Sequence, residues 1–403
     1  MTASTASSQL IKVPVSRLAL GMYVTDVDQS KVLTVVTAGL LRRREAISRL
    51  KRSNIKFVWV DANKSLPGSG LNNQAGSRSL HRVAQQGLKA PNSTRRQTLL
   101  CRQKKARHLV TEAKGMIRKV LGEVFEGKAI EVAPVEVLAD KIIESVMLDT
   151  DALQYVSALR SKDAYLLEHS VNVAVLLVTF GRHLDLPATT LRQLAVGGIL
   201  HDIGKIRIDN RILHKPGRLT PQEYEQIKQH QAFAMDALAN STQLHPVSKE
   251  VCLMHHEKLD GSGYPCGLAG DAIPLHGRIS NICDIYDALT ADRCYKEAMS
   301  PAAAFKVLLG MTPDQLDQQL VYEFIRCVGV YPVGSLVQLT DGRVGIVWDA
   351  CGREVRQPVV KCFYSLKQQH YTEVSFVDLQ RSPLEIERGI SAGSLTFDPS
   401  AFF

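Results

Sequence analysis

Residues 255–265 read HHEKLDGSGYP, which places two metal-capable imidazoles directly before a segment that cannot be helical. His255 and His256 are adjacent, and two glycines flank a serine before Tyr264 and Pro265. Glycine adopts backbone conformations that other residues avoid, and proline fixes its own φ angle and lacks an amide donor. We therefore expect a helix to end at the two histidines and the following loop to turn back over them.

The surrounding chain carries more groups that can hold metal. Each lies in or beside a segment whose apolar residues recur at helical spacing: His169, His201, Asp202, His230 and Asp284. Imidazoles and carboxylates together suit iron, manganese, cobalt or zinc, whereas a set without thiolates is unlike a structural zinc site. Any one of these histidines alone would more often be an ordinary core or surface residue, so the prediction of a metal site rests on the whole set.

The number of ligands favours two ions. Adjacent residues on a helix project about 100° apart, so His201 and Asp202 can face one cavity only if metal fills the angle between them. The same holds for His255 and His256. Two neighbouring pairs and three single ligands are more than one ion needs, and a carboxylate can bridge two ions. A two-metal centre can hold a bridging hydroxide and brace both the attacking and the leaving oxygen of a phosphoester hydrolysis.

HDIGK at residues 201–205 and HHEKLDGSGYPCGLAGDAIPLHGRI at residues 255–279 resemble the motifs of the HD-GYP domain, a branch of the HD metal-dependent phosphohydrolases. The resemblance extends over residues 163–309. It implies an all-helical metallohydrolase domain that converts the bacterial second messenger cyclic di-GMP to pGpG, GMP or both, by attack of a metal-bound hydroxide. It also implies two divalent metal ions: iron or manganese is expected, and zinc, cobalt, nickel and magnesium are the alternatives.

The resemblance further assigns roles to residues of this chain. It implies a catalytic contact between Lys205 and the scissile phosphate, and a place for Tyr264 beside the substrate phosphates. The metal ligands that it implies, with Asp202 as the bridge, are His169, His201, Asp202, His230, His255, His256 and Asp284. The positions that it implies for orienting the water network and holding the dinucleotide are Asp287, Arg293 and Lys296. Lysine and arginine can neutralise phosphate charge as it grows in the transition state, although an exposed helix end is the alternative for the last two.

Two positions depart from the family pattern. Members with a third metal carry a glutamate four residues before the first histidine, but this chain has Tyr165 there. The adjacent Glu168 should point elsewhere, because it is rotated by about 100° from His169 on a helix. Cys294 replaces the proline of the family's DRPY run, a change that removes no ligand. We therefore expect a binuclear and catalytically competent site.

The rest of the chain divides by composition and pattern. In residues 1–61, VLTVV and KFVWVD predict strands and REAISRLKR a helix, giving a small regulatory α/β domain that resembles the one often found before HD-GYP domains. Residues 62–104 are rich in small polar and basic residues and predict a flexible basic linker. Residues 105–330 form the helical domain. Alternating runs predict a small β subdomain over residues 331–380, followed by a tail over residues 381–403. The protein is therefore expected to be mainly α.

Local signals predict several helix starts and strands. Thr220-Pro221-Gln222-Glu223 combines a capping box with proline at the first helical position. Ser300-Pro301 and Thr312-Pro313 repeat the pattern of a cap followed by proline. SLVQLTDGRVGIVW, residues 335–348, predicts a hairpin around its Asp-Gly turn, and PVVKCFYS and TEVSFVDL predict further strands.

Composition narrows the class of protein. With 45% hydrophobic residues, no evident signal peptide and no membrane-spanning run, the chain is expected to be cytoplasmic. Its eight scattered cysteines without a CxxC motif fit free thiols better than disulfides or a thiolate zinc site. The net charge of +9 is concentrated between Ser77 and Lys119, where twelve basic residues and one acidic residue give +11. Such a segment could attract nucleic acid, anionic lipid or an acidic partner, but a solvated linker running into an exposed helix is the preferred interpretation. It contains no aromatic residue, which weakens the case for a platform that binds single-stranded nucleic acid.

Three functions remain open from the residues together with the resemblance. The leading prediction is a cyclic di-GMP phosphodiesterase. The second is a receptor or docking module with little turnover, which binds cyclic di-GMP or a GGDEF-type cyclase domain. The third is a hydrolase of another cyclic dinucleotide. A homodimer is compatible with all three.

Overall fold

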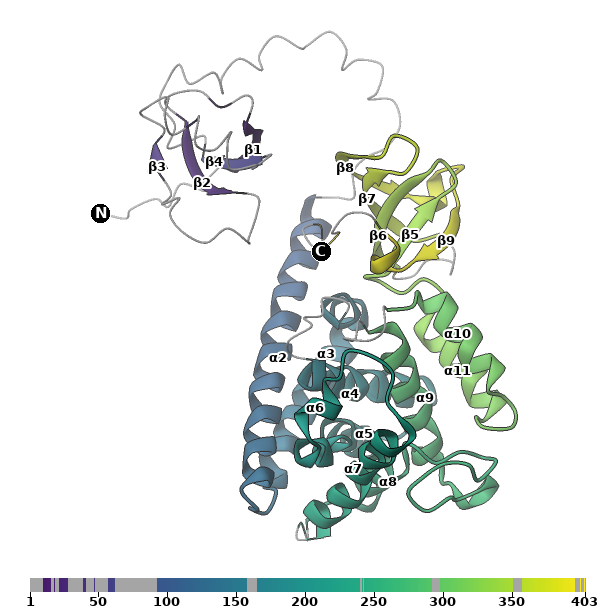
Figure 1. Ribbon diagram of the computed structural model, residues 1–403. Helices are drawn as coiled ribbons and strands as arrows, with labels where there is room; N and C mark the ends of the chain where they lie inside the picture. The colour runs from purple at the N-terminus through teal and green to yellow at the C-terminus, as the bar shows by residue number, and fades with distance from the viewer. Residues whose placement is uncertain are drawn as a thin grey trace. The chain divides into compact units, whose positions relative to one another are not determined.

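The computed structural model describes residues 10–15, 18, 22–27, 39–40, 47, 57–61, 93–157, 165–239, 241, 243–291, 298–350, 357–395, 399 and 402. These residues belong to two compact units, Met1–Lys89 and Ala90–Phe403, whose helices and strands are labelled in Figure 1. Within the described part of the chain, no helix is both long enough and apolar enough to cross a membrane. The predicted fold class is confirmed: the protein is mainly α, with a small strand-containing region at each end.

The N-terminal unit is built on an antiparallel sheet. Its described strands lie in the order β1-β4-β2-β3 and are β1 (Leu10–Pro14), β2 (Tyr23–Val27), β3 (Gly39–Leu40) and β4 (Phe57–Asp61). In β4, Val58 and Val60 are fully buried while Trp59 is 37% exposed, the alternation of a strand with one face on a core. The strand predicted from KFVWVD is thus confirmed. The predicted strand VLTVV and the predicted helix REAISRLKR lie outside the described residues, apart from Ile47, which packs against the core.

The second unit begins with a set of helices. The longer ones are α2 (Ser93–Phe125), α3 (Val132–Ser157), α4 (Tyr165–His183), α5 (Ala188–Leu200), α7 (Pro221–Ala239), α8 (Pro246–Met254), α9 (Leu275–Thr290), α10 (Pro301–Gly310) and α11 (Gln318–Val328). Short helical turns lie between them: η4 (Ile203–Arg207), α6 (Asn210–Leu213) and η5 (Gly270–Ala272). Helix α4 is central, because α3, α5, α9 and α11 all pack against it. Its VNVAVLLVTFG run, residues 171–181, is mostly apolar, and all of its residues except Leu176 are buried.

Two glycines let segments of this unit approach one another closely. A Cβ at Gly198 of α5 would lie 2.7 Å from the Cα of Ala174 in α4. A Cβ at Gly204 of η4 would lie 1.9 Å from the carbonyl oxygen of His230 in α7. Neither space admits a side chain without moving backbone, so the packing requires glycine at both positions. As a result, α5 lies directly on α4, and η4 lies directly on α7.

A five-stranded antiparallel sheet follows the described helices, in the order β8-β7-β6-β5-β9. Its strands are β5 (Leu336–Leu339), β6 (Arg343–Asp349), β7 (Val359–Ser365), β8 (His370–Asp378) and β9 (Ile386–Ile390). Two short helical turns, η6 (Leu379–Arg381) and η7 (Ala392–Ser394), come before and after β9. β5 and β6 form the predicted hairpin, with Gly342 at a φ of 88° in its turn. The strands predicted from PVVKCFYS and TEVSFVDL are confirmed as β7 and β8. Buried residues of this sheet and of the helices form one continuous cluster, so the β subdomain packs on the helices.

Two predicted helix starts are confirmed. At the start of α7, the Thr220 amide donates to the Glu223 carboxylate over 2.7 Å, and the Glu223 amide donates to the Thr220 hydroxyl over 3.2 Å. This reciprocal pair is a capping box. Ser300 caps α10 through its hydroxyl, which accepts from the amide of Ala303.

The third predicted helix start is wrong. Thr312 and Pro313 lie in a turn, and α11 begins at Gln318, where the Asp317 side chain accepts from the amide of Leu320. The Thr312 hydroxyl donates to the carbonyl of Leu309 over 2.8 Å, so it closes the preceding turn and does not cap the next helix.

Two segments differ from their predicted assignment. Helix α2 starts at Ser93, so residues 93–104, which composition places in the linker, are helical. The apolar spacing that continues this helix becomes visible only after residue 105. Residues 381–403 are predicted as a tail, but β9 within them pairs with β5 and completes the sheet. Its sequence, IERGI, lacks a clear alternation because it forms an edge strand whose middle is exposed.

The Gly204 packing yields a test of the fold. We expect Gly204→Ala to lower the free energy of unfolding by about 3 kcal/mol, because α7 must move to admit the new carbon. Gly115 on the exposed side of α2 is the matched control, since nothing lies within 4 Å of a Cβ built there. Gly115→Ala should raise the free energy of unfolding by about 0.5–1 kcal/mol through helix propensity alone. Urea denaturation followed by circular dichroism measures both, and equal small effects would contradict the close approach.

Candidate metal centre

The seven predicted metal ligands come together at one buried point. They are His169 on α4, His201 at the C-cap of α5, Asp202 at the N-cap of η4, His230 on α7, His255 at the C-cap of α8, the following His256, and Asp284 on α9. Helix α8 ends at Met254, so the predicted end of a helix at the paired histidines is confirmed. Most of these side chains are less than 10% exposed. Burying polar and charged groups costs free energy unless hydrogen bonds, ion pairs or a metal ion offset it.

A first group of ligands surrounds the Nε2 atom of His169. This nitrogen lies 3.1 Å from Nε2 of His201, 3.3 Å from Oδ2 of Asp202 and 3.0 Å from Oδ1 of Asp284. Nε2 of His201 is also 3.4 Å from Oδ2 of Asp202. Two imidazoles and two carboxylate oxygens therefore converge, which is a donor set that divalent metal ions use.

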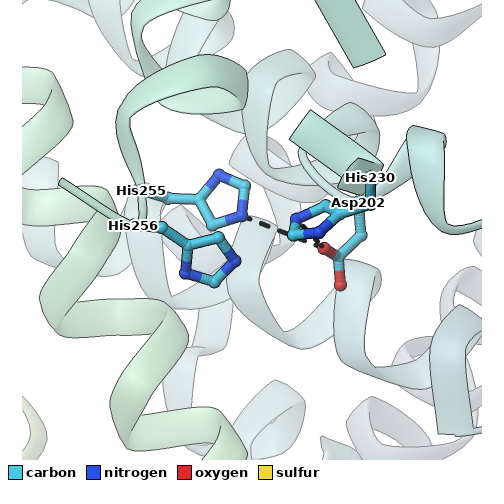
Figure 2. Close-up of side chains that lie close together, drawn as sticks. All are labelled: Asp202, His230, His255 and His256. Carbon is cyan, nitrogen blue, oxygen red and sulfur yellow. Dashed lines mark ion pairs between the residues drawn. The ribbon is translucent and has the colours of Figure 1, made fainter. Parts of the chain in front are cut away.

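A second group of ligands lies on the other side of Asp202. Its Oδ1 atom is 3.7 Å from Nε2 of His230 and 3.9 Å from Nε2 of His255, and His256 completes the group (Figure 2). This Oδ1 atom is buried and has no hydrogen-bond partner among the described residues. A buried carboxylate oxygen without a partner is costly unless a cation satisfies it. The residues present therefore fit a metal on each side of Asp202, with one oxygen directed at each.

Hydrogen bonds fix the orientation of the histidine rings. The Nδ1 atoms of three rings donate to backbone carbonyls at short range: His201 to Gly198 over 2.8 Å, His230 to Ile227 over 2.6 Å and His255 to Val251 over 3.1 Å. Since a carbonyl can only accept, Nδ1 carries the proton and Nε2 keeps its lone pair. In the fourth ring, Nδ1 of His169 contacts Oδ2 of Asp287 over 2.7 Å, which has the same effect. Each of the four Nε2 lone pairs is thus held ready for a metal ion.

Burial keeps the second group of histidines neutral. It lowers the pKa of His230 to about 4 and the pKa of His255 to about 3. Neutral imidazole is the form that binds metal, so neither ring has to lose a proton at neutral pH. Burial opposes ionisation of Asp202, but Lys205 and His201 hold the pKa of that carboxyl well below its ordinary range. Asp202, the predicted bridging residue, is therefore an ionised carboxylate at neutral pH.

The loop after His256 is organised by the carboxylate of Glu257. This side chain is 2% exposed and accepts from the backbone amides of Cys266 over 2.7 Å and Leu268 over 2.9 Å. The amide of Tyr264 donates to the carbonyl of His256 over 3.2 Å, which closes the loop back on the metal ligands. The predicted turn of the glycine-rich loop over the metal centre is thus present, and Glu257 is the group that holds it.

Tyr264 reaches the metal centre through ring contacts. Its ring stacks on His256 with centroids 4.5 Å apart and an interplanar angle of 28°. Nζ of Lys228 on α7 lies 5.8 Å from the centroid of Tyr264 and 5.5 Å from the centroid of Tyr224, which is 47% exposed. Burial raises the pKa of Tyr264, so its phenol stays protonated and can donate a hydrogen bond. An ammonium between two tyrosine rings therefore borders the site.

The remaining predicted residues have different outcomes. Nζ of Lys205 lies 2.6 Å from Oδ2 of Asp202, beside the first group of ligands. Asp287 contacts His169, as described above. Glu168 turns away from the site and pairs with Lys114 of α2 over 2.8 Å, in agreement with the predicted direction. The predictions for Arg293, Cys294 and Lys296, and for the side chain of Tyr165, lie outside the described residues.

Sequence reasoning missed several residues of the site: Tyr224, Lys228, Gln231 and Glu257. Glu257 stands within the HHEKLDGSGYP stretch, but its role appears only when the loop folds back and presents two amides to it. Gln231 follows His230 directly, and that adjacency is the one sequence signal that could have drawn attention to it. Tyr224 and Lys228 lie one helical turn apart on α7, a spacing that places them on one face.

Two family models match the chain. One, described as an HD domain, covers residues 155–320 and so includes every described metal ligand. The other, described as a domain of unknown function (DUF3391), covers residues 10–135. The second match spans nearly all of the N-terminal unit and the whole of α2, and ends in the first turn of α3.

Relatives match the chain over different lengths. A cyclic di-GMP phosphodiesterase of Pseudomonas aeruginosa is 35% identical over 376 residues, which are 93% of this chain and 90% of the relative. A 3'3'-cGAMP-specific phosphodiesterase of Vibrio cholerae is 42% identical over 123 residues, which are 30% of this chain and 24% of the relative. A solved structure of an HDG"Y"P protein from Bdellovibrio bacteriovorus matches with a TM-score of 0.46 and 16% identity, covering 78% of this chain and 98% of that one.

The Glu257 contacts yield a test of the loop. We expect Glu257→Ala to lower the free energy of unfolding by about 1–3 kcal/mol, because two partly buried backbone amides lose their charged acceptor. The loop should also become accessible to a protease, which mass spectrometry of the fragments would locate between residues 257 and 268. Metal content measured by mass spectrometry should stay at the wild-type level, since Glu257 is not among the predicted ligands. Unchanged stability and unchanged proteolysis would contradict the organising role.

Proposed function

This chain belongs to the HD-GYP family of phosphodiesterases, and we propose that the substrate it hydrolyses is cyclic di-GMP. The choice of substrate is supported by the relative that carries this activity in its name and matches 93% of the chain. The relatives named for 3'3'-cGAMP match shorter parts of the chain, 30–39% of its length. The proposed products are pGpG, GMP or both.

The single observation that carries a two-metal mechanism is the position of Asp202. One carboxylate oxygen faces His169 and His201, while the other faces His230 and His255. We propose that His169, His201, Asp202 and Asp284 hold one divalent ion, and that Asp202, His230, His255 and His256 hold the other. Two such ions would supply a nucleophile at neutral pH and neutralise charge on the attacking and leaving oxygens. Iron or manganese remains the expected metal, as the family resemblance implies, and imidazole and carboxylate donors are compatible with either.

Residues around the ions have distinct proposed tasks. Lys205 is partly exposed and adjoins Asp202, so its ammonium can donate to a phosphate oxygen or to the leaving group. Asp287 accepts the Nδ1 proton of His169 and holds that ring in its metal-binding orientation. The protonated phenol of Tyr264 can donate to a phosphate oxygen. Arg293 and Lys296, outside the described residues, remain predicted contacts of the dinucleotide.

Product analysis tests the proposed function. Protein loaded with Mn²⁺ is incubated with cyclic di-GMP, and chromatography identifies pGpG and GMP. We expect Asp202→Asn to reduce turnover by at least about 1000-fold, because the shared carboxylate is lost to both ions. Asp140→Asn, which changes an exposed aspartate of α3 paired with Arg192, is the matched control and should keep wild-type turnover. Chelation of the metal should abolish turnover and lower the melting temperature.

Turnover that survives Asp202→Asn would overturn the assignment of the centre. Tight binding of cyclic di-GMP without product over hours would instead favour the receptor with little turnover. The catalytic assay depends neither on a GGDEF-type partner nor on a homodimer. Both therefore stay predictions.

The tyrosine pair around Lys228 yields a prediction about base recognition. Lysine is a common donor to O6 and N7 of guanine, whereas adenine presents an amino group in place of O6. We expect Lys228→Met to lower kcat/KM for cyclic di-GMP by about 10–100-fold, with a smaller effect on cyclic di-AMP, because a good base contact contributes about 1–3 kcal/mol. Lys306→Met, an exposed lysine of α10, is the control. Equal losses for both dinucleotides would show that Lys228 does not read the base.

A further inference from the structure

The strongest unexplained feature of the molecule is the side chain of Gln231, which lies fully buried between two predicted ligands. Its Nε2 atom is 2.9 Å from Nε2 of His230 and 3.2 Å from Nε2 of His255. Its Oε1 atom is buried and has no hydrogen-bond partner among the described residues. A buried amide oxygen without a partner costs about 1–3 kcal/mol, so this placement needs a reason.

The histidine tautomers show what the amide faces. Nδ1 of His230 and Nδ1 of His255 donate to backbone carbonyls, so both Nε2 atoms present lone pairs to Gln231. As placed, the amide NH2 group donates to both lone pairs and leaves Oε1 unsatisfied. The oxygen and nitrogen of a side-chain amide exchange places by a 180° rotation, and their assignment follows from the surrounding groups. In the rotated state, Oε1 would face two lone pairs, which is favourable only when a cation lies among the three atoms.

Distances support the rotated state when metal is bound. For an ion with ligands at about 2.1 Å and angles near 90°, neighbouring ligand atoms are about 3 Å apart. The amide atom of Gln231 meets this spacing with both histidine nitrogens. Oδ1 of Asp202, which also lacks a hydrogen-bond partner, faces the same two nitrogens at 3.7 and 3.9 Å. In the rotated state, Oε1 of Gln231 and Oδ1 of Asp202 would both border this point, and a cation there would satisfy both oxygens.

We propose that the side-chain oxygen of Gln231 is an additional ligand of the ion held by Asp202, His230, His255 and His256. The inference rests on the proposed metal centre and adds a residue to it. A neutral amide oxygen raises the coordination number without adding charge. Five protein donors favour ions that accept five or six ligands, such as Mn²⁺ or Fe²⁺, over tetrahedral Zn²⁺. Gln231 would therefore contribute to the choice of metal as well as to its affinity.

Metal binding to variants of the full chain tests this inference. Gln231→Leu removes the oxygen at similar volume, and Gln231→Glu keeps an oxygen and adds charge. Gln229→Leu, an exposed glutamine on the same helix, is the matched control. Mn²⁺ affinity is measured by competition with a fluorescent chelator, and Co²⁺-loaded protein is examined by visible absorption, which is weak for five- or six-coordinate ions and strong for four-coordinate ones.

We expect Gln231→Leu to weaken one of two Mn²⁺ sites by about 10–100-fold and to increase the Co²⁺ absorption, while Gln231→Glu keeps two ions. Gln229→Leu should match the wild type. Unchanged Mn²⁺ affinity and an unchanged Co²⁺ spectrum in Gln231→Leu would overturn the inference, even if the wild type hydrolyses cyclic di-GMP. A weakened site in a protein that does not hydrolyse cyclic di-GMP would support the ligand and overturn the proposed function. Wild-type protein that binds no metal would overturn both.

Discussion

The two oxygens of the Asp202 carboxylate face opposite groups of histidine nitrogens, and the rest of the site is arranged around this one side chain. Asp202 sits at the N-cap of a short helical turn that follows α5, so its neighbour His201 caps the end of one helix while Asp202 begins the next. His201 keeps α-helical backbone angles, and Asp202 departs from them with a φ of −100° and a ψ of 13°. Nε2 of His201 and Oδ2 of Asp202 lie 3.4 Å apart, so the two adjacent residues can serve one centre.

Helix packing brings the other ligands to Asp202. Gly198 allows α5 to lie on α4, which carries His169, and Gly204 allows η4 to lie on α7, which carries His230. Backbone carbonyls near the helix ends then orient the rings, because each accepts an Nδ1 proton and leaves Nε2 free to bind metal. The loop after His256 adds Tyr264 to the centre, held by the buried carboxylate of Glu257. The predicted metal ligands and Tyr264 are therefore parts of one packed unit.

Much of this could be predicted from the sequence, because the ligands are unusual residue types in buried helical patterns. The β5–β6 hairpin was equally predictable from its alternation and Asp-Gly turn. Local pattern failed where a tertiary partner decides the outcome. Thr312 resembles a cap but closes the turn before it, and IERGI becomes a strand only because β5 offers it an edge. Glu257 gave no signal of its own, and Gln231 gave none beyond its adjacency to His230, since their roles also depend on groups that are distant in the sequence.

The most direct test of the account is the anomalous X-ray diffraction of a crystal grown with Mn²⁺. The account predicts two anomalous peaks about 3.5–4 Å apart, with a different oxygen of Asp202 bound to each ion. A single peak, or two peaks of which only one contacts Asp202, would contradict the bridging carboxylate on which the proposed mechanism rests.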